Sequence, residues 1–453
     1  MSNGEKKNEE KKNGNGSEAN DAALAAKQKK NFLFISWESL SGDLAWKVKQ
    51  EGHEVRSYID NKKERDVYDG FFEKVEDWKE HVEWADVMVF DDTGFGKEAD
   101  ALRKKGKYVV GGSVYTDRLE DDREFGQAEM KRVGMLTLPH WDFESFDEGI
   151  KFVKENPGRY IFKPSQGTYG DMRGIVFLGE EEDGKDILEV LEHNKDTWQK
   201  KIKRFQIQKQ ATGVEVAVGA FFNGEDFLYP INVNFEHKKL FPGDIGPYTG
   251  EMGTLMYWSP SNTLFNTTLA KMRDDLKSAG YVGYFDINCI ANARGIYPLE
   301  FTSRFGYPTI SIQMEGITQD MGELLYVMAS RQPVDIKTKK GFQVGAVVAV
   351  PPFPYSDEDE FSIYKDFSIL FRKPNLDGMH LGDVKLVDGD WKVTGQIGYA
   401  LVVTGSGLTV EEARKQMYGR ISNVMLQNMF YRTDIGAKWP EDSDRLHMWG
   451  YLY

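Results

Sequence analysis

Residues 243–253 read Gly-Asp-Ile-Gly-Pro-Tyr-Thr-Gly-Glu-Met-Gly, and this stretch is the most informative in the chain. Four glycines and one proline in eleven residues disfavour the interior of a regular helix or strand. The stretch therefore predicts a backbone-rich loop that can approach a ligand closely. A glycine-rich surface turn with no ligand is the alternative interpretation.

Length and composition limit the kind of protein to which this loop belongs. A chain of 453 residues with 40% hydrophobic and 13% aromatic residues is long enough for several packed subdomains. A net charge of −14 disfavours general attraction to nucleic-acid phosphates. The single cysteine, Cys289, excludes an intrachain disulfide and a zinc site built on cysteines. Because long apolar runs and a signal-peptide core are missing, we expect a cytoplasmic protein with no membrane partner.

The first 30 residues differ from the rest of the chain. They are rich in Lys, Glu, Asn and Gly and predict a disordered tail over 1–30. Order is expected from residue 31, with apolar strands at 32–35, 53–59, 84–92 and 107–112 and a helix at 42–50. This alternation predicts a Rossmann-like parallel sheet over 31–112. Since Gly-x-Gly-x-x-Gly does not follow the first strand, a dinucleotide site has little support.

A lysine followed by glycines marks the middle of the chain. Residues 159–164 read as a strand that presents Lys163, and 165–174 follow as Ser-Gln-Gly-Thr-Tyr-Gly-Asp-Met-Arg-Gly. A strand lysine can neutralise phosphate charge while backbone N–H groups of a glycine loop bind the phosphate oxygens. An exposed lysine beside an ordinary hairpin is the alternative.

Two acidic residues lie on a predicted strand pair further on. The strands, 283–291 and 296–302, are joined by a turn at 292–295, and antiparallel pairing would bring Asp286 and Glu300 within reach of each other. Hard oxygen ligands of this kind suit Mg²⁺ that bridges phosphates. The alternative is that each acid only ends a strand.

Taken together, these segments resemble the phosphoribosylamine–glycine ligases (GAR synthetases), which are ATP-grasp enzymes. The family's substrate loop reads Gly-Asp-x-Gly-Pro-Asn-Thr-Gly-Gly-Met-Gly, close to residues 243–253. Its Arg-Phe-Gly-Asp-Pro-Glu is similar to 304–309, and its Tyr-Tyr-Arg-x-Asp-Ile-Gly to 430–436. The resemblance spans roughly residues 107–436 and is strongest at 235–310.

The resemblance implies a fold of the α/β (α+β) class. An ATP-grasp domain with two subdomains would occupy 113–330, after the Rossmann-like pre-ATP-grasp domain. A small C-terminal domain of strands and helices would occupy 331–453. ATP and Mg²⁺ are the implied cofactors.

The resemblance also implies where ATP binds. Lys163 and Arg123 would meet the phosphates, and the loop at 165–174 would close over them. Glu215 would bind the ribose hydroxyls, and the hinge that follows Gln208-Lys209 would bind adenine through backbone groups. The family has Glu-Glu at that hinge. The predicted cofactor-binding residues are Arg123, Lys163, Gln166, Gly167, Gln208, Lys209 and Glu215.

The implied metal ligands are Asp286, Glu300 and Thr302, of which Thr302 replaces the family's asparagine. Three residues are predicted to be catalytic. Lys163 would offset charge during phosphoryl transfer, Arg304 would meet a substrate phosphate or carboxylate, and Asp244 would meet the substrate amine. His237 is a further candidate for the lining of the site, and the other histidines are interpreted as structural.

The chain departs from the family near the expected acceptor site. Residues 36–43 replace the family's Gly-Arg-Glu-His loop, and Tyr307 and Thr309 replace two acids. The main hypothesis is therefore an ATP-dependent ligase that activates a small amino acid such as glycine and joins it to a different amine, for example a nucleotide or modified nucleobase. The alternatives are a true phosphoribosylamine–glycine ligase of purine biosynthesis and a non-catalytic nucleotide-binding descendant. A monomer or homodimer is expected.

Overall fold

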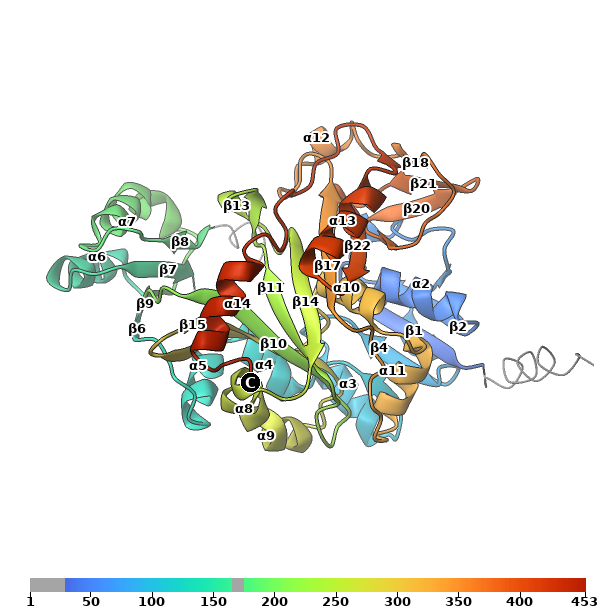
Figure 1. The fold of residues 1–453 in the computed structure, drawn as a ribbon, viewed down its shortest axis with the longest axis horizontal. Helices are drawn as coiled ribbons and strands as arrows, with labels where there is room; N and C mark the ends of the chain where they lie inside the picture. Colours follow the sequence, from blue (N-terminus) through green and yellow to red (C-terminus); the bar gives the residue numbers. More distant parts are fainter. Residues whose placement is uncertain (1–28, 165–174) are drawn as a thin grey trace, which may run out of the picture.

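A computed structural model describes residues 29–164 and 175–453, and its N-terminal part is a five-stranded parallel sheet (Figure 1). The strand order is β3-β2-β1-β4-β5. The strands are β1 (Asn31–Ser36), β2 (Glu54–Ile59), β3 (Glu73–Lys74), β4 (Val87–Phe90) and β5 (Tyr108–Val110). The accompanying helices are α2 (Gly42–Gln50), η1 (Lys62–Glu64), η2 (Trp78–His81) and α3 (Gly96–Lys104). The predicted Rossmann-like arrangement is thus confirmed.

The alternation of side chains along β1 explains why this sheet is covered on both faces. Phe32 and Phe34 pack into one apolar cluster with residues of α2, whereas Leu33 and Ile35 pack into another with residues of α3. All four side chains are fully buried, as expected for the central strand of a parallel sheet. The predicted tail falls almost entirely on residues 1–28, which lie outside the described part of the chain.

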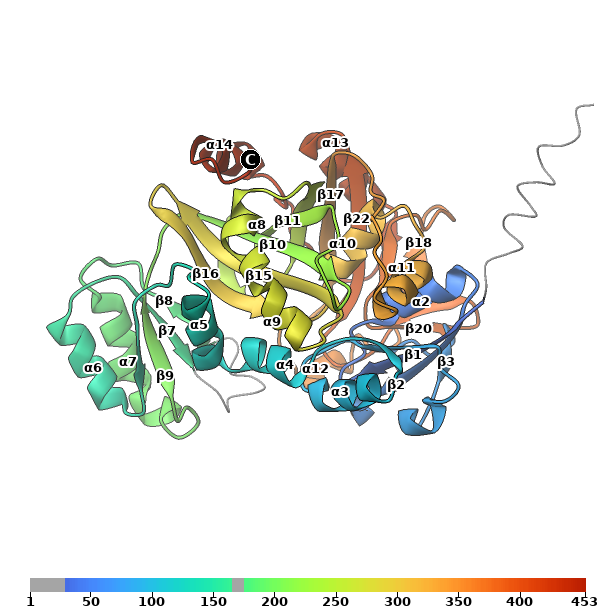
Figure 2. The same ribbon diagram turned by 90° about the horizontal axis from the view of Figure 1, so that it is seen from below.

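A small antiparallel sheet stands apart from the rest of the molecule, with α6 and α7 packed on it (Figures 1 and 2). Its strand order is β6-β9-β7-β8. The elements are β6 (His140–Phe143), α6 (Phe146–Glu155), β7 (Tyr160–Pro164), β8 (Phe177–Leu178), α7 (Lys185–Trp198) and β9 (Phe205–Lys209). Helices α4 (Val114–Asp121) and α5 (Arg123–Arg132) connect it to the N-terminal sheet.

An antiparallel sheet of eight strands forms the body of the molecule, in the order β16-β15-β10-β11-β14-β17-β22-β19. Its strands are β10 (Val214–Phe222), β11 (Ile231–Glu236), β14 (Gly253–Ser259), β15 (Gly283–Asn292), β16 (Gly295–Thr302), β17 (Phe342–Ala349), β19 (Met379–Leu381) and β22 (Tyr399–Gly407). Strands on both sides of the predicted domain boundary at residue 330 share this sheet, since β14 pairs with β17. The division at 330 stays a prediction.

Shorter elements complete the fold. A second four-stranded sheet has the order β20-β21-β18-β23, from β18 (Ser368–Phe371), β20 (Val384–Val387), β21 (Asp390–Val393) and β23 (Val424–Met425). The remaining helices are α8 (Thr263–Thr267), η4 (Leu269–Met272), α9 (Arg273–Ser278), α10 (Thr309–Gly316), α11 (Met321–Ala329), α12 (Glu358–Phe361), α13 (Val410–Ile421) and α14 (Trp439–Met448). Within the described ranges, no helix has the length and apolarity needed to span a membrane.

The glycine-rich stretch is less irregular than expected. Residues Ile245–Tyr248 form strand β13, which pairs with β12 (Lys239–Phe241) in a two-stranded hairpin. The prediction of a loop without strands was wrong here, although the pairing is minimal and its register shifts between Lys239 and Phe241. Gly243 and Gly246 supply the positive φ angles, +78° and +84°, that this hairpin requires.

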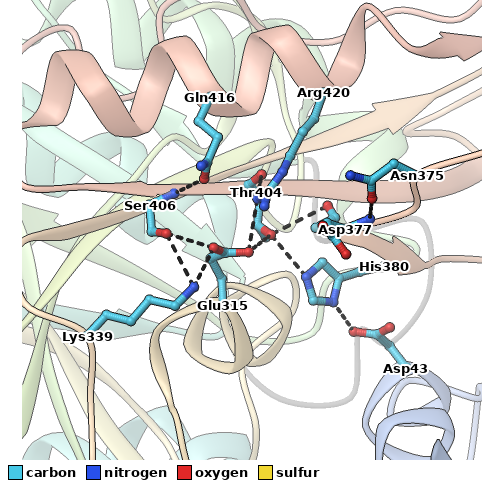
Figure 3. A network of polar contacts seen from close by, with 11 residues as sticks. Asp43, Glu315, Lys339, Asn375, Asp377, His380, Thr404, Ser406, Gln416 and Arg420 are labelled. Carbon is cyan, nitrogen blue, oxygen red and sulfur yellow. Dashed lines mark hydrogen bonds and ion pairs between the residues drawn. The ribbon is translucent and has the colours of Figure 1, made fainter. Parts of the chain in front are cut away.

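A polar network joins the N-terminal domain to the C-terminal part of the large sheet (Figure 3). Asp43 of α2 contacts His380 Nδ1 at 2.8 Å, and His380 Nε2 lies 3.0 Å from Thr404 Oγ1. Thr404 in turn donates to Glu315 Oε2 at 3.0 Å, as does Arg420 Nη1. These contacts fix α2, α10, α13 and two strands relative to one another.

Candidate ATP site

A cleft of about 670 Å³ lies between the small sheet and one end of the large sheet. Its walls come from β8, the segment 210–213 that follows β9, the ends of β10 and β11, and α14. The segment 210–213 directly follows Gln208 and Lys209, the residues predicted at the adenine hinge, and Glu215, the predicted ribose ligand, lines the cleft two residues further on. The structure thus brings the predicted nucleotide-binding strands to one cavity.

Lys163 lies on β7 beside β9, where Gln208 reaches it from the neighbouring strand. Its Nζ donates to Gln208 Oε1 at 2.8 Å, and the lysine is only 8% exposed. Burial, reinforced by the nearby charge of Arg123, lowers the pKa of Lys163 to about 7. A phosphate group beside this amine would restore its charge. The predicted ligands Gln166 and Gly167, and the loop 165–174, lie outside the described residues.

Lys238 is the centre of a cluster of three carboxylates. Its Nζ lies 3.2 Å from Glu215 Oε1, 3.3 Å from Glu236 Oε2 and 3.3 Å from Glu300 Oε1. Burial alone would lower the pKa of Lys238, but the carboxylates outweigh it and hold the pKa well above its ordinary value. The attraction of Lys238 also lowers the pKa of Glu300 to about 2, so this carboxylate is ionised at neutral pH.

The predicted metal ligands lie on the pair β15–β16. Asp286 is paired with Thr302 and Asn288 with Glu300, so the two acids are diagonal neighbours. Burial, with the charge of Glu236 next, raises the pKa of Asp286 well above its ordinary value. Among the described residues, no three His, Cys, Asp or Glu side chains form a ready-made metal cage. The donor chemistry fits Mg²⁺, which takes one or two carboxylates and completes its shell with phosphate oxygens and water.

Two buried acceptor atoms border the carboxylate cluster without a hydrogen-bond donor among the described residues. Asn288 donates through Nδ2 to Glu236 Oε2 at 2.9 Å, while its Oδ1 is unpaired. Glu251 Oε1 is also unpaired, and burial raises the pKa of Glu251 well above its ordinary value. This part of the site therefore contains more hydrogen-bond acceptors and negative charge than its own donors satisfy.

Arg304 lies where β16 leaves the large sheet and meets the N-terminal domain. Its Nε contacts Asp92 Oδ1 at 3.0 Å and Glu120 Oε1 at 2.9 Å, so two acids of other elements fix the guanidinium. Tyr307, which replaces a family acid, donates its hydroxyl to the carbonyl of Asp91 at 3.3 Å. The role of Arg304 toward a substrate oxyanion stays a prediction.

Asp244 lies in the glycine-rich hairpin at the edge of the cleft. Its Oδ1 accepts from Arg432 Nη1 at 2.9 Å, and its Oδ2 accepts from Lys438. These cations hold the pKa of Asp244 below its ordinary value despite partial burial, which acts in the opposite direction. Its predicted contact with a substrate amine stays a prediction. His237 also lines the cleft, and burial lowers its pKa to about 4, so the ring is neutral.

Three of these residues, Glu236, Lys238 and Arg432, were not among the predicted site residues. A signal for the first two was present, because the segment Phe235-Glu-His-Lys-Lys239 follows a buried strand and resembles the family's Asp-His-Lys-Arg. Of the residues in this segment, only His237 was predicted to line the site. The resemblance at 430–436 gave Arg432 no site role, because nothing local to these residues indicates that they meet a hairpin nearly 190 residues earlier.

A cleft between a small antiparallel sheet and a larger sheet that bears carboxylates is typical of the ATP-grasp fold. A family model described as phosphoribosylglycinamide synthetase, ATP-grasp (A) domain, matches residues 121–310. Residues 121–310 are thus similar to the ATP-grasp domain of GAR synthetases, and this similarity supports an ATP-dependent carboxylate–amine ligase.

Relatives and solved structures agree with this assignment. The phosphoribosylamine–glycine ligase of Streptococcus pneumoniae is 26% identical over 364 residues, which cover 77% of this chain and 82% of that protein. The ligase of Clostridium acetobutylicum is 24% identical over 419 residues, covering 87% and 96%.

Among solved structures, phosphoribosylamine–glycine ligase from Thermotoga maritima matches with a TM-score of 0.66 and 21% identity, covering 89% of this chain and all of that one. Biotin carboxylase from Campylobacter jejuni, solved as a β,γ-ATP complex, matches with a TM-score of 0.60 and 14% identity, covering 95% and 98%. Both structures share the fold with this chain.

Proposed function

We propose that this protein is an ATP- and Mg²⁺-dependent carboxylate–amine ligase that joins glycine to phosphoribosylamine. The observation that carries the proposal is the cleft lined by Glu215, Glu236 and Lys238, in which Lys238 also lies 3.3 Å from Glu300. The specific substrates are supported by the relatives, several of which are named phosphoribosylamine–glycine ligase.

Each part of the cleft has a role in this proposal. Lys163 and Arg123 would offset the charge of the ATP phosphates, and the hinge 210–213 would hold adenine through backbone groups. Glu215 would bind the ribose hydroxyls, exchanging its contact with Lys238 for them. Glu300 would supply the principal carboxylate for Mg²⁺, whose charge would offset that of the ATP phosphates.

The chemistry proceeds in two steps. The carboxylate of the amino acid attacks the γ-phosphorus of ATP, which forms an acyl phosphate and releases ADP. The acceptor amine then attacks the acyl carbon, which forms the C–N bond and releases phosphate and a proton. The chain contributes preorganised charge and exclusion of water, because acyl phosphates hydrolyse readily.

A second candidate keeps the mechanism and changes the acceptor. The loop after β1 is turned toward a buried acid: Ser36 Oγ and the backbone N–H of Ser41 both donate to Asp91 Oδ2. Asp91 is fully buried, and desolvation raises its pKa to about 7. A loop engaged in this way offers no cation to a ribose phosphate, which favours an acceptor such as a nucleotide or nucleobase held elsewhere.

Complementation of a strain that lacks its own glycine ligase, combined with an ADP-release assay, tests the proposal. Growth without purines, and ADP release that requires both glycine and phosphoribosylamine, are the expected results. ADP release with glycine but a different amine would replace the first candidate by the second. No ADP release with any amino acid and amine would favour a non-catalytic nucleotide-binding protein.

A further inference from the structure

The glycine-rich hairpin forms one wall of the cleft, yet little of it is buried. Phe241 is 46% exposed and Ile245 63% exposed, whereas Leu240 of β12 is buried in a small apolar cluster with Met252 and Val347. Asp244 at its turn adopts a positive φ of +56°, a region that non-glycine residues rarely occupy. Leu240 therefore anchors strand β12 by burial, whereas the exposed turn and β13 are held by polar contacts to other elements.

Those contacts come from a C-terminal segment that leads into α14. Arg432 is completely buried, and its Nη1 donates both to the carbonyl of Lys239 and to Asp244 Oδ1, each at 2.9 Å. One guanidinium nitrogen therefore bridges a strand and the turn of the hairpin. A buried arginine can be kept only where its charge and its donors are satisfied.

Asp434 provides a second connection between the C-terminal segment and the hairpin. Its Oδ1 and Oδ2 accept from Arg432 Nε and Nη2 at 2.8 and 2.7 Å, which is a bidentate pair. The same Oδ2 also accepts from the backbone N–H of Gly243 at 2.9 Å. These pairings lower the pKa of Asp434 to about 2 against the effect of burial, so the pair is ionised at neutral pH.

Lys438 completes the set by donating to Asp244 Oδ2. Both carboxylate oxygens of Asp244 thus have a cationic partner, and each cation comes from the C-terminal segment. We call Asp244, Arg432, Asp434 and Lys438 the hairpin clamp. Its two anions and two cations balance, so it needs no further charge from a ligand.

We propose that the hairpin clamp is a positioning device of the active site, in which Arg432 sets the conformation of the hairpin and Asp244 acts as its anchor rather than as a ligand of the substrate amine. The hairpin then presents Tyr248, whose ring lies 3.7 Å from the Lys239 ammonium, to the cleft. The kinetic part of this proposal rests on the proposed ligase function.

The proposal is tested first without an activity assay. Hydrogen–deuterium exchange of the hairpin peptide, residues 239–248, is compared in wild type, Arg432→Lys and Asp434→Asn. Arg432→Lys keeps the charge but removes the planar fork, so we expect exchange in the hairpin to accelerate by about tenfold or more. Arg445→Lys on α14, which makes the same substitution in an exposed pair with Glu441, is the matched control and should leave exchange unchanged. Unchanged hairpin exchange in both clamp variants, with the protein still folded, would overturn the proposal.

Kinetics then separate an anchor from a substrate ligand. If Asp244 acts through the clamp, Asp244→Asn and Arg432→Lys should each lower kcat/KM for the amino acid about tenfold, and the double variant should lose little more. Multiplying losses in the double variant would instead show that Asp244 contacts substrate directly. If wild type releases no ADP with any substrate, the ligase proposal fails, whereas hydrogen exchange still decides the role of the clamp.

Discussion

Glu315 and Lys238 are each the centre of a polar network, and the two networks are balanced in opposite ways. Glu315 Oε1 accepts from Lys339 at 2.8 Å and Oε2 accepts from Arg420 at 3.0 Å, with hydroxyl donors in addition, so one anion meets two cations (Figure 3). Lys238 is a single cation among three carboxylates. The first network is satisfied by the chain itself, whereas the second has an excess of negative charge.

This difference separates a structural network from a binding site. A folded chain is stabilised by pairing its buried charges, whereas Glu215 and Glu300 are partly exposed at the cleft, where a ligand can use carboxylates that Lys238 alone does not balance. These carboxylates lie beside the residues proposed to hold Mg²⁺ and ATP. The comparison therefore predicts that substitutions at Glu315 change stability, and that substitutions around Lys238 change binding and turnover.

The largest expected effect is on stability at Glu315. Glu315→Gln removes the anion and leaves Arg420 and Lys339 without it, which should lower the free energy of unfolding by about 3–5 kcal/mol. Denaturation by urea measures this, and ATP affinity by calorimetry on the folded protein should be unchanged. A Glu315→Gln protein as stable as wild type would contradict the structural role of the Glu315 network.

The pH dependence of the same residue sharpens this prediction. Lys339 and Arg420, acting against burial, lower the pKa of Glu315 to about 2 from an ordinary value of 4.5. The stabilisation is therefore complete above about pH 4.5 and is lost as the pH falls through about 2, a contribution of about 3 kcal/mol. The difference in stability between wild type and Glu315→Gln should shrink over that window.

At the opposite network, Glu300→Gln should lower turnover by about a hundredfold or more, since it removes the ionised carboxylate proposed for Mg²⁺. The free energy of unfolding should also fall, because the attraction of Lys238 that lowers the Glu300 pKa is lost, but by less than for Glu315→Gln, since the Glu300 side chain is half exposed. Steady-state ADP release across a Mg²⁺ titration measures the effect. Turnover and Mg²⁺ dependence like those of wild type would place the metal elsewhere.

A smaller effect is expected from Lys163, whose pKa of about 7 lies well below the ordinary lysine value of 10.5. At pH 8 the free amine is mostly neutral, and ATP phosphates should raise its pKa, so binding should take up close to one proton. Calorimetry in two buffers of different ionisation enthalpy detects this uptake, which should vanish near pH 6. Lys163→Ala should bind ATP about tenfold or more weakly and show no uptake. Equal affinity in the variant would remove Lys163 from the site.

The smallest expected effect is that of Thr302→Asn, which restores the amide of the family's strand. Turnover should change by less than about threefold, and Mg²⁺ affinity should be equal or higher, because an amide oxygen is the stronger ligand. The pairing of Thr302 with Asp286 predicts that the added amide lies beside that acid. A large loss of activity would mean that the Thr302 hydroxyl has a role of its own.

Much of the fold could be predicted from short segments. The turn at 292–295 and its flanking strands are confirmed, since Asn292 pairs with Gly295 at the end of β15–β16. The helix predicted at 42–50 has those bounds in the structure. Such elements depend on local alternation and turn residues, which a sequence displays directly. The pairing of β14 with β17 could not be predicted, because it joins segments separated by nearly a hundred residues.

The sequence by itself determined a resemblance to GAR synthetases and the chemistry of individual positions: a strand lysine, paired acids and a glycine-rich segment. Only the tertiary structure decided the partners of those groups. It placed Lys238 among three carboxylates from three strands, and it engaged both oxygens of Asp244 with Arg432 and Lys438. The physical reason is that charge and hydrogen-bonding capacity belong to a residue, whereas the state of a charge depends on the groups that long-range packing brings within about 4 Å of it.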